Sequence, residues 1–446
     1  MTDTGLLGRW FRLEAHGATV RTEILAGATT FLALAYIVFV QPAVLAAAGM
    51  DFGAVMAATC LASAIATVLM AVLANYPIAV APAMGHNFFF AYTVVLGMGV
   101  PWQAALGAVA IAGLVFIATA GIGLRERLIT ALPPFLQHAI AAGIGLLIAM
   151  IGLQWSGLIV AAPGTMVALG KLNAPPTLLA LFGLALTAVL FAARFRGAIL
   201  AGMLLTTAAG LAFGIVPYQG LVSTPPSIAP TLLQLDVRGA LTPALAPVIL
   251  IFFFLALFDS VGTLVGVAGQ AGLMREGRLP RAREALLADA VGTVAGAALG
   301  TSTVTAYIES ATGVAAGGRT GLASLVTAAL LLLSLFFSPL VRMIGGGCQV
   351  AQGVVLYPVV APALILVGTL MMREVRHIEW DDPVEAVPAF LTMMIMPLAV
   401  SITEGIAFGL VAAVLLKGAT GRGRELHWLI YVFAILFVLR YVFLRG

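Results

Sequence analysis

Long apolar runs follow one another along almost the whole of this chain, separated by short polar or Gly- and Pro-rich connections. A helix needs about 20 apolar residues to cross the hydrocarbon core of a bilayer, and the runs are of that size. With 62% hydrophobic and only 9% charged residues, the 446-residue chain has more apolar surface than a soluble core could bury. The sequence therefore predicts an all-α polytopic membrane protein.

The runs form two sets of seven, which predicts 14 transmembrane spans. The first repeat is residues 1–216, with spans near 24–46, 54–73, 78–97, 103–123, 136–155, 177–193 and 198–216. A polar, Pro-rich extracellular linker, 217–243, precedes the second repeat, 244–417, with spans near 244–270, 284–300, 302–317, 320–337, 350–371, 385–400 and 402–417. An odd number of crossings makes the second set enter from the opposite side, as an inverted repeat requires. The C-terminal segment, 418–446, contains an extra apolar helix at 428–444 that is long enough to span the membrane or to lie along its surface.

Basic residues support this arrangement, because cytoplasmic connections are enriched in Lys and Arg. With the N-terminus in the cytoplasm, only Lys171, Arg238 and Arg342 fall outside. The cytoplasmic connections then contain Arg125, Arg127, Arg194, Arg196, Arg275, Arg278, Arg281, Arg283, Arg319, Arg373, Arg376, Lys417, Arg422 and Arg424. We expect a multi-pass protein of the plasma or inner membrane.

The third and tenth spans begin poorly as helices. Residues 76–85 contain two prolines, and residues 300–307 are rich in hydroxyl and β-branched side chains. Each predicts an extended segment that runs into a half-helix, a backbone arrangement tolerated at membrane depth only where protein or a cavity satisfies it. Their matching places in the two halves indicate a transport site near the midplane.

Two acids, Asp259 and Glu309, lie inside apolar segments, where an ionisable group usually marks a substrate or proton path. Removal from water favours a neutral carboxyl, so one acid can bind a proton near neutral pH while the other accepts hydrogen bonds from a substrate. Either acid can take either role. Asp289 is a further candidate for proton coupling, with a packing role as the alternative.

Three more side chains at the breaks are candidate substrate contacts: His86, Asn87 and Tyr307. The Asn87 amide can donate and accept at once, which suits a heterocycle with adjacent N–H and C=O groups. A helix cap is the alternative for Asn87, and packing or capping is the alternative for His86.

Other function classes find little support. The chain has no HExxH motif, its five histidines are scattered, and Cys60 and Cys348 are isolated, so neither an enzyme nor a metal or cofactor site is expected. The net charge of +4 comes from loop arginines, which gives no reason to expect nucleic-acid binding. A channel usually repeats one pore element, whereas two unequal breaks with buried acids favour alternating access.

Several strings closely resemble motifs of the nucleobase:cation symporters, in the hypoxanthine/guanine/adenine permease branch of the xanthine/uracil permease superfamily. They include APAMGHNFFFAY, FDSVGTLVG, TSTVTAYIES and GGRTGL, and the resemblance runs from about Arg9 to the C-terminus. The family commonly reads APGMGLNA where this chain has Ala83, His86 and Phe88, and commonly has an acid where this chain has Ala256.

The resemblance implies a core domain of spans 1–4 and 8–11 and a gate domain of spans 5–7 and 12–14. It implies that a purine base binds between spans 3 and 10, held by Asp259 and Glu309 with Asn87 from span 3, and that the protein is a homodimer in membrane lipid. The expected function is import of hypoxanthine, guanine or adenine with protons, sodium being the other possible coupling ion. Carriage of xanthine, uracil or a small anion on the same fold is the alternative.

Overall fold

The computed structural model describes residues 6–121, 133–162, 164–274, 279–351 and 354–443. Arg125, Arg127, Arg275 and Arg278, used above for topology, lie outside these ranges. The first half contains α1 (Leu6–Trp10), α2 (Val20–Leu34), α3 (Ile37–Ala47), α4 (Phe52–Leu69), β1 (Val80–Pro82), α5 (Met84–Phe88), α6 (Trp102–Gly121), α8 (Pro134–Trp155), β2 (Ile159–Ala162), β3 (Met166–Leu169), α9 (Pro175–Ala192) and α10 (Ala198–Ala212).

The second half follows a linker with one short helix, α11 (Val237–Ala240). It contains α12 (Ala246–Gln270), α13 (Ala282–Leu299), β4 (Val304–Ala306), α14 (Ser310–Ala315), α15 (Gly321–Leu333), α16 (Ser338–Gly345), β5 (Cys348–Ala351), β6 (Val354–Leu356), α17 (Ala361–Met371), α18 (Pro383–Leu398), α19 (Ile402–Ala419) and α20 (Trp428–Phe443). The linker runs over one end of the helices, where Leu233 N–H donates to the Ala298 carbonyl and Asp236 N–H to the Gln103 carbonyl.

The prediction of a polytopic helical membrane protein is confirmed. In the described ranges, eight helical segments are long and apolar enough to cross a membrane, and three shorter apolar helices accompany them. The helices do not coincide one for one with the apolar runs of the sequence. Residues 350–356 belong largely to the β5–β6 hairpin, so the helix predicted over 350–371 begins only at Ala361, since Val-rich strands are as apolar as helices. The count of 14 spans stays a prediction.

The extended segments predicted in the third and tenth spans are present, and they pair with each other. β1 and β4 are antiparallel, with Val80 opposite Ala306 and Pro82 opposite Val304. Both strands are fully buried. Each runs into a helix, β1 into α5 and its π-helical continuation to Gly97, and β4 into α14.

One threonine on a neighbouring helix holds the backbone of each strand. The Thr67 hydroxyl on α4 donates to the Val80 carbonyl at 3.0 Å and accepts from the Val80 N–H at 2.9 Å. The Thr293 hydroxyl on α13 does the same for Val304, at 2.9 and 3.2 Å. These bonds satisfy peptide groups that a two-stranded sheet leaves unpaired in a buried environment.

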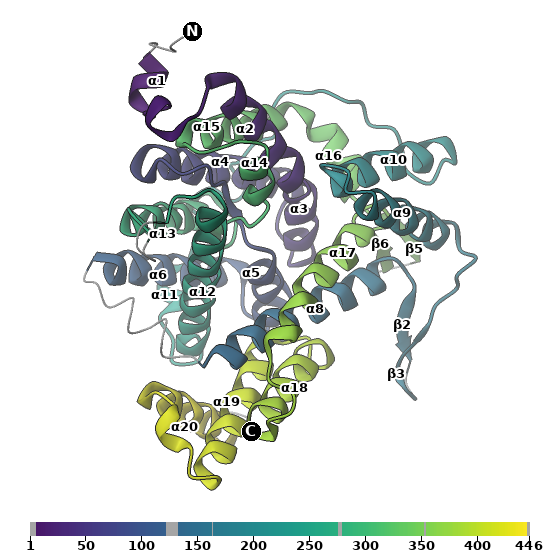
Figure 1. Ribbon diagram of the computed structural model, residues 1–446. Coiled ribbons are helices and arrows are strands. Elements are labelled where there is room, and N and C mark those ends of the chain that lie inside the picture. The colour runs from purple at the N-terminus through teal and green to yellow at the C-terminus, as the bar shows by residue number, and fades with distance from the viewer. Residues whose placement is uncertain (1–5, 122–132, 163, 275–278, 352–353, 444–446) are drawn as a thin grey trace.

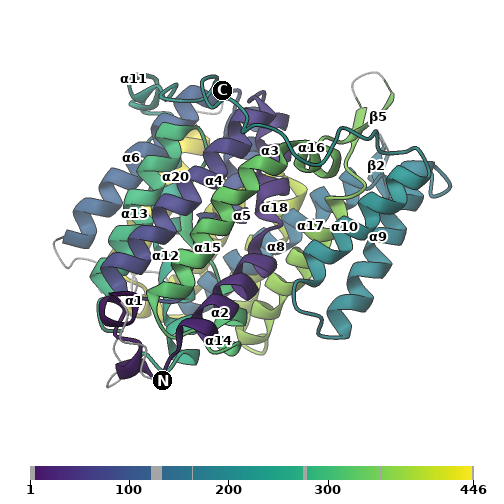
Figure 2. The ribbon, with the colours of Figure 1, turned by 90° about the horizontal axis from the view of Figure 1, so that it is seen from above.

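The helices pack into two groups (Figures 1 and 2). In the first group, α13 packs on α4 and α6, α15 packs on α2 and α4, and α12 packs on α6. In the second group, α8 packs on α17 and α18, α18 packs on α19, and α9 packs on α10 and α17. Gly145 and Gly368 allow the close crossing of α8 and α17, because a Cβ at Gly368 would meet the Gly145 carbonyl oxygen at 2.5 Å. The paired strands belong to the first group and lie beside α12 and α13.

Candidate functional site

A cavity of about 1260 Å³ lies between the two groups of helices. One wall comes from α12, the start of α5, the segment from β4 to α14, and Tyr36 between α2 and α3. The other comes from α8, the α9–α10 connection, α17, α19 and α20. The cavity therefore places the ends of both paired strands opposite the second group.

The basic residues of the lining are exposed at one end of the cavity. They are Arg194 and Arg196, between α9 and α10, and Arg373 and Arg376, after α17. Because these arginines both line the cavity and are exposed, we call the part of the cavity beside them its mouth. The residues around the paired strands contribute carboxylate, hydroxyl and imidazole groups to the lining instead.

Asp259 lies on the cavity wall in the middle of α12. The helix is continuous from Ala246 to Gln270, so Asp259 caps no helix. Its side chain is exposed to the cavity, and Oδ2 accepts a hydrogen bond from the Thr305 hydroxyl of β4 at 2.9 Å. A carboxylate with one protein donor retains acceptor positions for a ligand.

Glu309 lies on the same wall, at the residue before α14. Its Oε1 accepts a hydrogen bond from the Tyr36 hydroxyl at 2.6 Å, and its side chain is partly exposed. Tyr307 is buried on the cavity wall, where its hydroxyl donates to the Pro82 carbonyl at 2.5 Å. The Tyr307 hydroxyl thus ties β4 to β1.

His86 and Asn87 point in different directions, because adjacent residues on a helix are turned by about 100°. His86 lines the cavity and is 3% exposed, and its Nε2 has no hydrogen-bond partner among the described residues. Asn87 is fully buried behind the strands and is not part of the described lining; its Oδ1 accepts from the Ser302 hydroxyl. Gln41 donates to that same hydroxyl at 3.3 Å.

Asp289 also lies behind the strands and is fully buried. Its Oδ2 accepts from the Ala306 N–H at 3.2 Å, so this acid supports the last residue of β4 from α13. Of the six predicted site residues, four line the cavity, whereas Asn87 bonds the Ser302 hydroxyl before β4 and Asp289 bonds the backbone of β4.

Sequence reasoning missed Tyr36, Thr305 as the partner of Asp259, and the place of the predicted C-terminal helix on the cavity wall. Tyr36 lies in an apolar run, and the signal that could have identified it is a phenol close to Pro42 within a membrane span. α20 contributes five residues to the lining, although its apolar stretch lies outside both repeats.

The chain is similar to known proteins in both sequence and fold. Residues 21–408 match the family described as "Permease family". The chain is 47% identical to the guanine/hypoxanthine permease PbuG of Bacillus subtilis, covering 98% of this chain and 99% of the relative. It is 44% identical to the adenine permease AdeP of Escherichia coli, covering 99% and 97%. The transmembrane domain of a cyanobacterial bicarbonate transporter, BicA, has a similar fold, with a TM-score of 0.62 at 18% identity over 88% of this chain and 97% of that one.

Proposed function

This chain belongs to the permease family and is a transporter, and on that premise we propose that it imports a purine nucleobase together with protons by alternating access. One observation carries the proposal. Two carboxyl groups from different elements, Asp259 and Glu309, face one cavity beside a pair of extended segments.

The substrate class follows from the hydrogen-bonding groups on this wall. Purine bases present ring N–H groups and adjacent acceptors, and carboxylates accept N–H bonds strongly. Relatives along the full length are named for adenine, guanine and hypoxanthine. Two carboxylates repel a small anion. The similar fold of a bicarbonate transporter therefore does not make bicarbonate the proposed substrate of this chain.

We assign different roles to the two acids. Asp259 is bound by a neutral hydroxyl and is exposed to the cavity, so it binds the N–H edge of the base. Glu309 is held by the Tyr36 hydroxyl on the same wall, and it binds and releases the transported proton. His86 offers its unpartnered Nε2 to the same base. Tyr307, Asn87 and Asp289 act as positioning residues that fix β1 and β4.

The two helix groups correspond to a transport core and a gate in this proposal. The core contains the strands and both acids, and the gate forms the facing wall. The basic mouth belongs on the cytoplasmic side by the positive-inside rule, which places the N-terminus in the cytoplasm of a cell with the protein in its plasma or inner membrane. The structure then corresponds to an inward-open state. A homodimer in membrane lipid completes the proposal.

Uptake by cells that lack their own nucleobase permeases tests this function. We expect accumulation of radiolabelled adenine, guanine or hypoxanthine that collapses with a protonophore at fixed sodium. Accumulation that survives the protonophore but requires sodium contradicts proton coupling. Uptake of bicarbonate or uracil without any purine contradicts the substrate class.

A further inference from the structure

The C-terminal helix α20 forms part of the cavity wall although it lies outside both repeats. The residues that line the cavity are Leu429, Ile430, Phe433, Leu436 and Phe437. Their spacing of i, i+1, i+4, i+7 and i+8 places them on one face of the helix. Ile435 and Val432, which are not part of this stripe, are 58% and 39% exposed on the outside. The helix thus separates the cavity from the surroundings of the protein.

The lining face of α20 meets an aromatic surface on α12. Phe433 packs edge-to-face on Phe254, with ring centroids 5.4 Å apart and an interplanar angle of 90°. Phe254 in turn stacks on Phe258, and both line the cavity. Phe258 directly precedes Asp259. Aromatic side chains therefore follow one wall up to the proposed base-binding acid.

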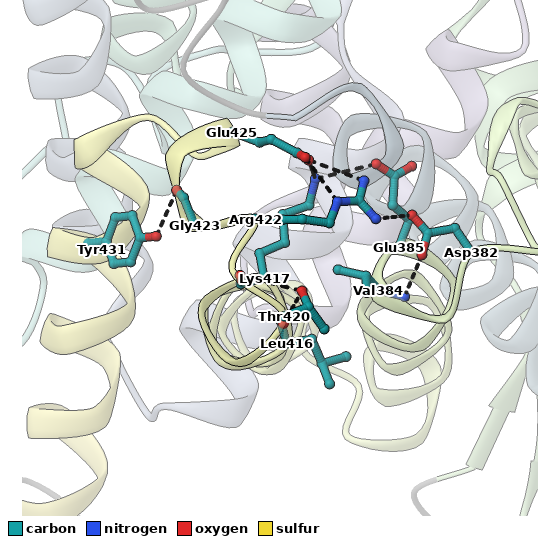
Figure 3. A network of polar contacts seen from close by, with 10 residues as sticks. All are labelled: Asp382, Val384, Glu385, Leu416, Lys417, Thr420, Arg422, Gly423, Glu425 and Tyr431. Carbon is teal, nitrogen blue, oxygen red and sulfur yellow. Dashed lines mark hydrogen bonds and ion pairs between the residues drawn. The ribbon is translucent and has the colours of Figure 1, made fainter.

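Polar contacts fix the beginning of α20 to the second group of helices (Figure 3). Lys417, at the end of α19, lies 2.7 Å from a Glu425 carboxylate oxygen and 3.4 Å from one of Glu385 on α18. Arg422 pairs with Asp382 at 2.5 Å and with Glu425 at 2.9 Å. The pairs therefore join α19 and the beginning of α18 to the connection that leads into α20.

Two tyrosines of α20 add contacts along its length. The Tyr431 hydroxyl donates to the Gly423 carbonyl at 2.8 Å in the connection (Figure 3). Near the other end, the Tyr441 hydroxyl donates to Glu404 of α19, which is 6% exposed. The helix is therefore attached to the gate-side group at both ends, while its aromatic contact is to α12 of the other group.

We propose that α20 is a wall of the substrate path and that Phe433 and Phe437 contact the flat face of the base between the mouth and Asp259. Every nucleobase has an aromatic face, so such stacking binds the substrate class without selecting one base. The edge contacts at Asp259 and His86 then select among bases. This inference rests on the proposed function for the identity of the substrate, but the position of α20 on the cavity wall does not.

Cysteine labelling tests the wall independently of transport. In a background with Cys60→Ala and Cys348→Ala, Phe433→Cys is compared with Ile435→Cys on the outer face of the same helix. A hydrophilic methanethiosulfonate should modify position 433 about tenfold faster, since the reactive thiolate needs water. Saturating adenine, guanine or hypoxanthine should slow modification at 433 and leave 435 unchanged.

The outcomes separate this inference from the proposed function. Equal modification of the two positions overturns α20 as a cavity wall. Selective modification of 433 that no accumulated base slows overturns the contact with substrate. If the wild type accumulates no purine at all, the proposed function is wrong, whereas selective modification of 433 still supports the wall.

Transport kinetics test the role of the ring itself. Phe433→Ala should raise KM about five- to tenfold for every transported base, with kcat changed much less, because stacking is lost while the edge contacts stay. Phe433→Tyr keeps the ring and should restore the wild-type KM, and Ile435→Ala serves as the matched control. An unchanged KM in Phe433→Ala at normal membrane expression overturns the contact.

Discussion

The two extended segments share one architecture and differ in chemistry. Val80 and Val304 are each held by a threonine from the preceding span, and the strands pair with each other. The β1 side contributes the imidazole of His86 to the cavity, whereas the β4 side contributes the carboxyl group of Glu309. The difference teaches that the repeated part of the fold supplies geometry, and that both carboxyl groups proposed for binding and coupling, Asp259 and Glu309, come from the second half.

The largest effect on transport is expected when the carboxylate charges of Asp259 and Glu309, both in the second half, are removed. Asp259→Asn and Glu309→Gln keep the shape of each side chain. A lost carboxylate bond to a ligand should cost about 2 to 5 kcal/mol, enough to abolish measurable uptake. Asp259→Asn should lose affinity for base in a binding assay, whereas Glu309→Gln should keep affinity and lose concentrative uptake. Wild-type accumulation by both amides at normal expression would show that the acids are structural.

Removing the shared threonine contacts tests whether the two halves are mechanically equivalent. Thr67→Val and Thr293→Val each leave a buried N–H and C=O without the hydroxyl, so each should lower the free energy of unfolding by about 1 to 3 kcal/mol. Thermal unfolding of the purified protein measures the effect. Thr29→Val is the matched control, because its hydroxyl bonds only the Leu25 carbonyl within α2. A loss in only one of the two variants contradicts the equivalence.

A smaller effect on substrate affinity is expected from substitution of His86, on the β1 side of the cavity. His86→Leu removes the imidazole that lines the cavity and should change affinities by about 1 kcal/mol, enough to reorder adenine, guanine and hypoxanthine in competition assays. Met84→Leu, on the same wall, changes no polar group and should leave the order unchanged. An unchanged order in His86→Leu would assign this side chain to packing.

The smallest effect is expected for Glu425, in the connection to α20, and Asp382, before α18, which belong to neither extended segment. Arg422 and Lys417 lower the pKa of Glu425 from 4.5 to about 2, and Arg422 lowers the pKa of Asp382. Because both folded-state pKa values are depressed, the stabilisation is complete above the usual carboxyl range and is lost as pH falls toward 2. Melting temperature should therefore fall between pH 4.5 and 2 more steeply in the wild type than in Arg422→Gln. The exposed Arg424→Gln should behave like the wild type.

The sequence predicts well those features that depend on local chemistry. Prolines at 77 and 82 and the β-branched run at 303–305 are poor in helices, and the strands lie there. An acid within an apolar span is equally visible, and Asp259 lies on the cavity wall. The sequence does not reveal which way a side chain points or which distant residue it contacts. Nothing in the order of residues reveals that His86 turns toward the cavity and Asn87 away from it.

Long-range contacts are the other part that sequence reasoning missed. Tyr36 and Glu309 are 273 residues apart along the chain, and Phe433 of α20 packs on Phe254 of α12, in the other group of helices. The sequence predicts a helix where the β5–β6 hairpin lies, because apolar β-branched residues fit both structures. These features follow from packing between distant segments, which no local periodicity encodes.

The pairing of β1 with β4 also constrains how the protein is made. During synthesis, the first half emerges with β1 and its peptide groups but without the strand that pairs with them. An unpaired strand at membrane depth is costly, so the nascent first half needs shielding by lipid headgroups, water or an insertion factor until residues 304–306 arrive. The pairing of β1 thus waits for the second half, and a chain interrupted before β4 keeps an open strand edge.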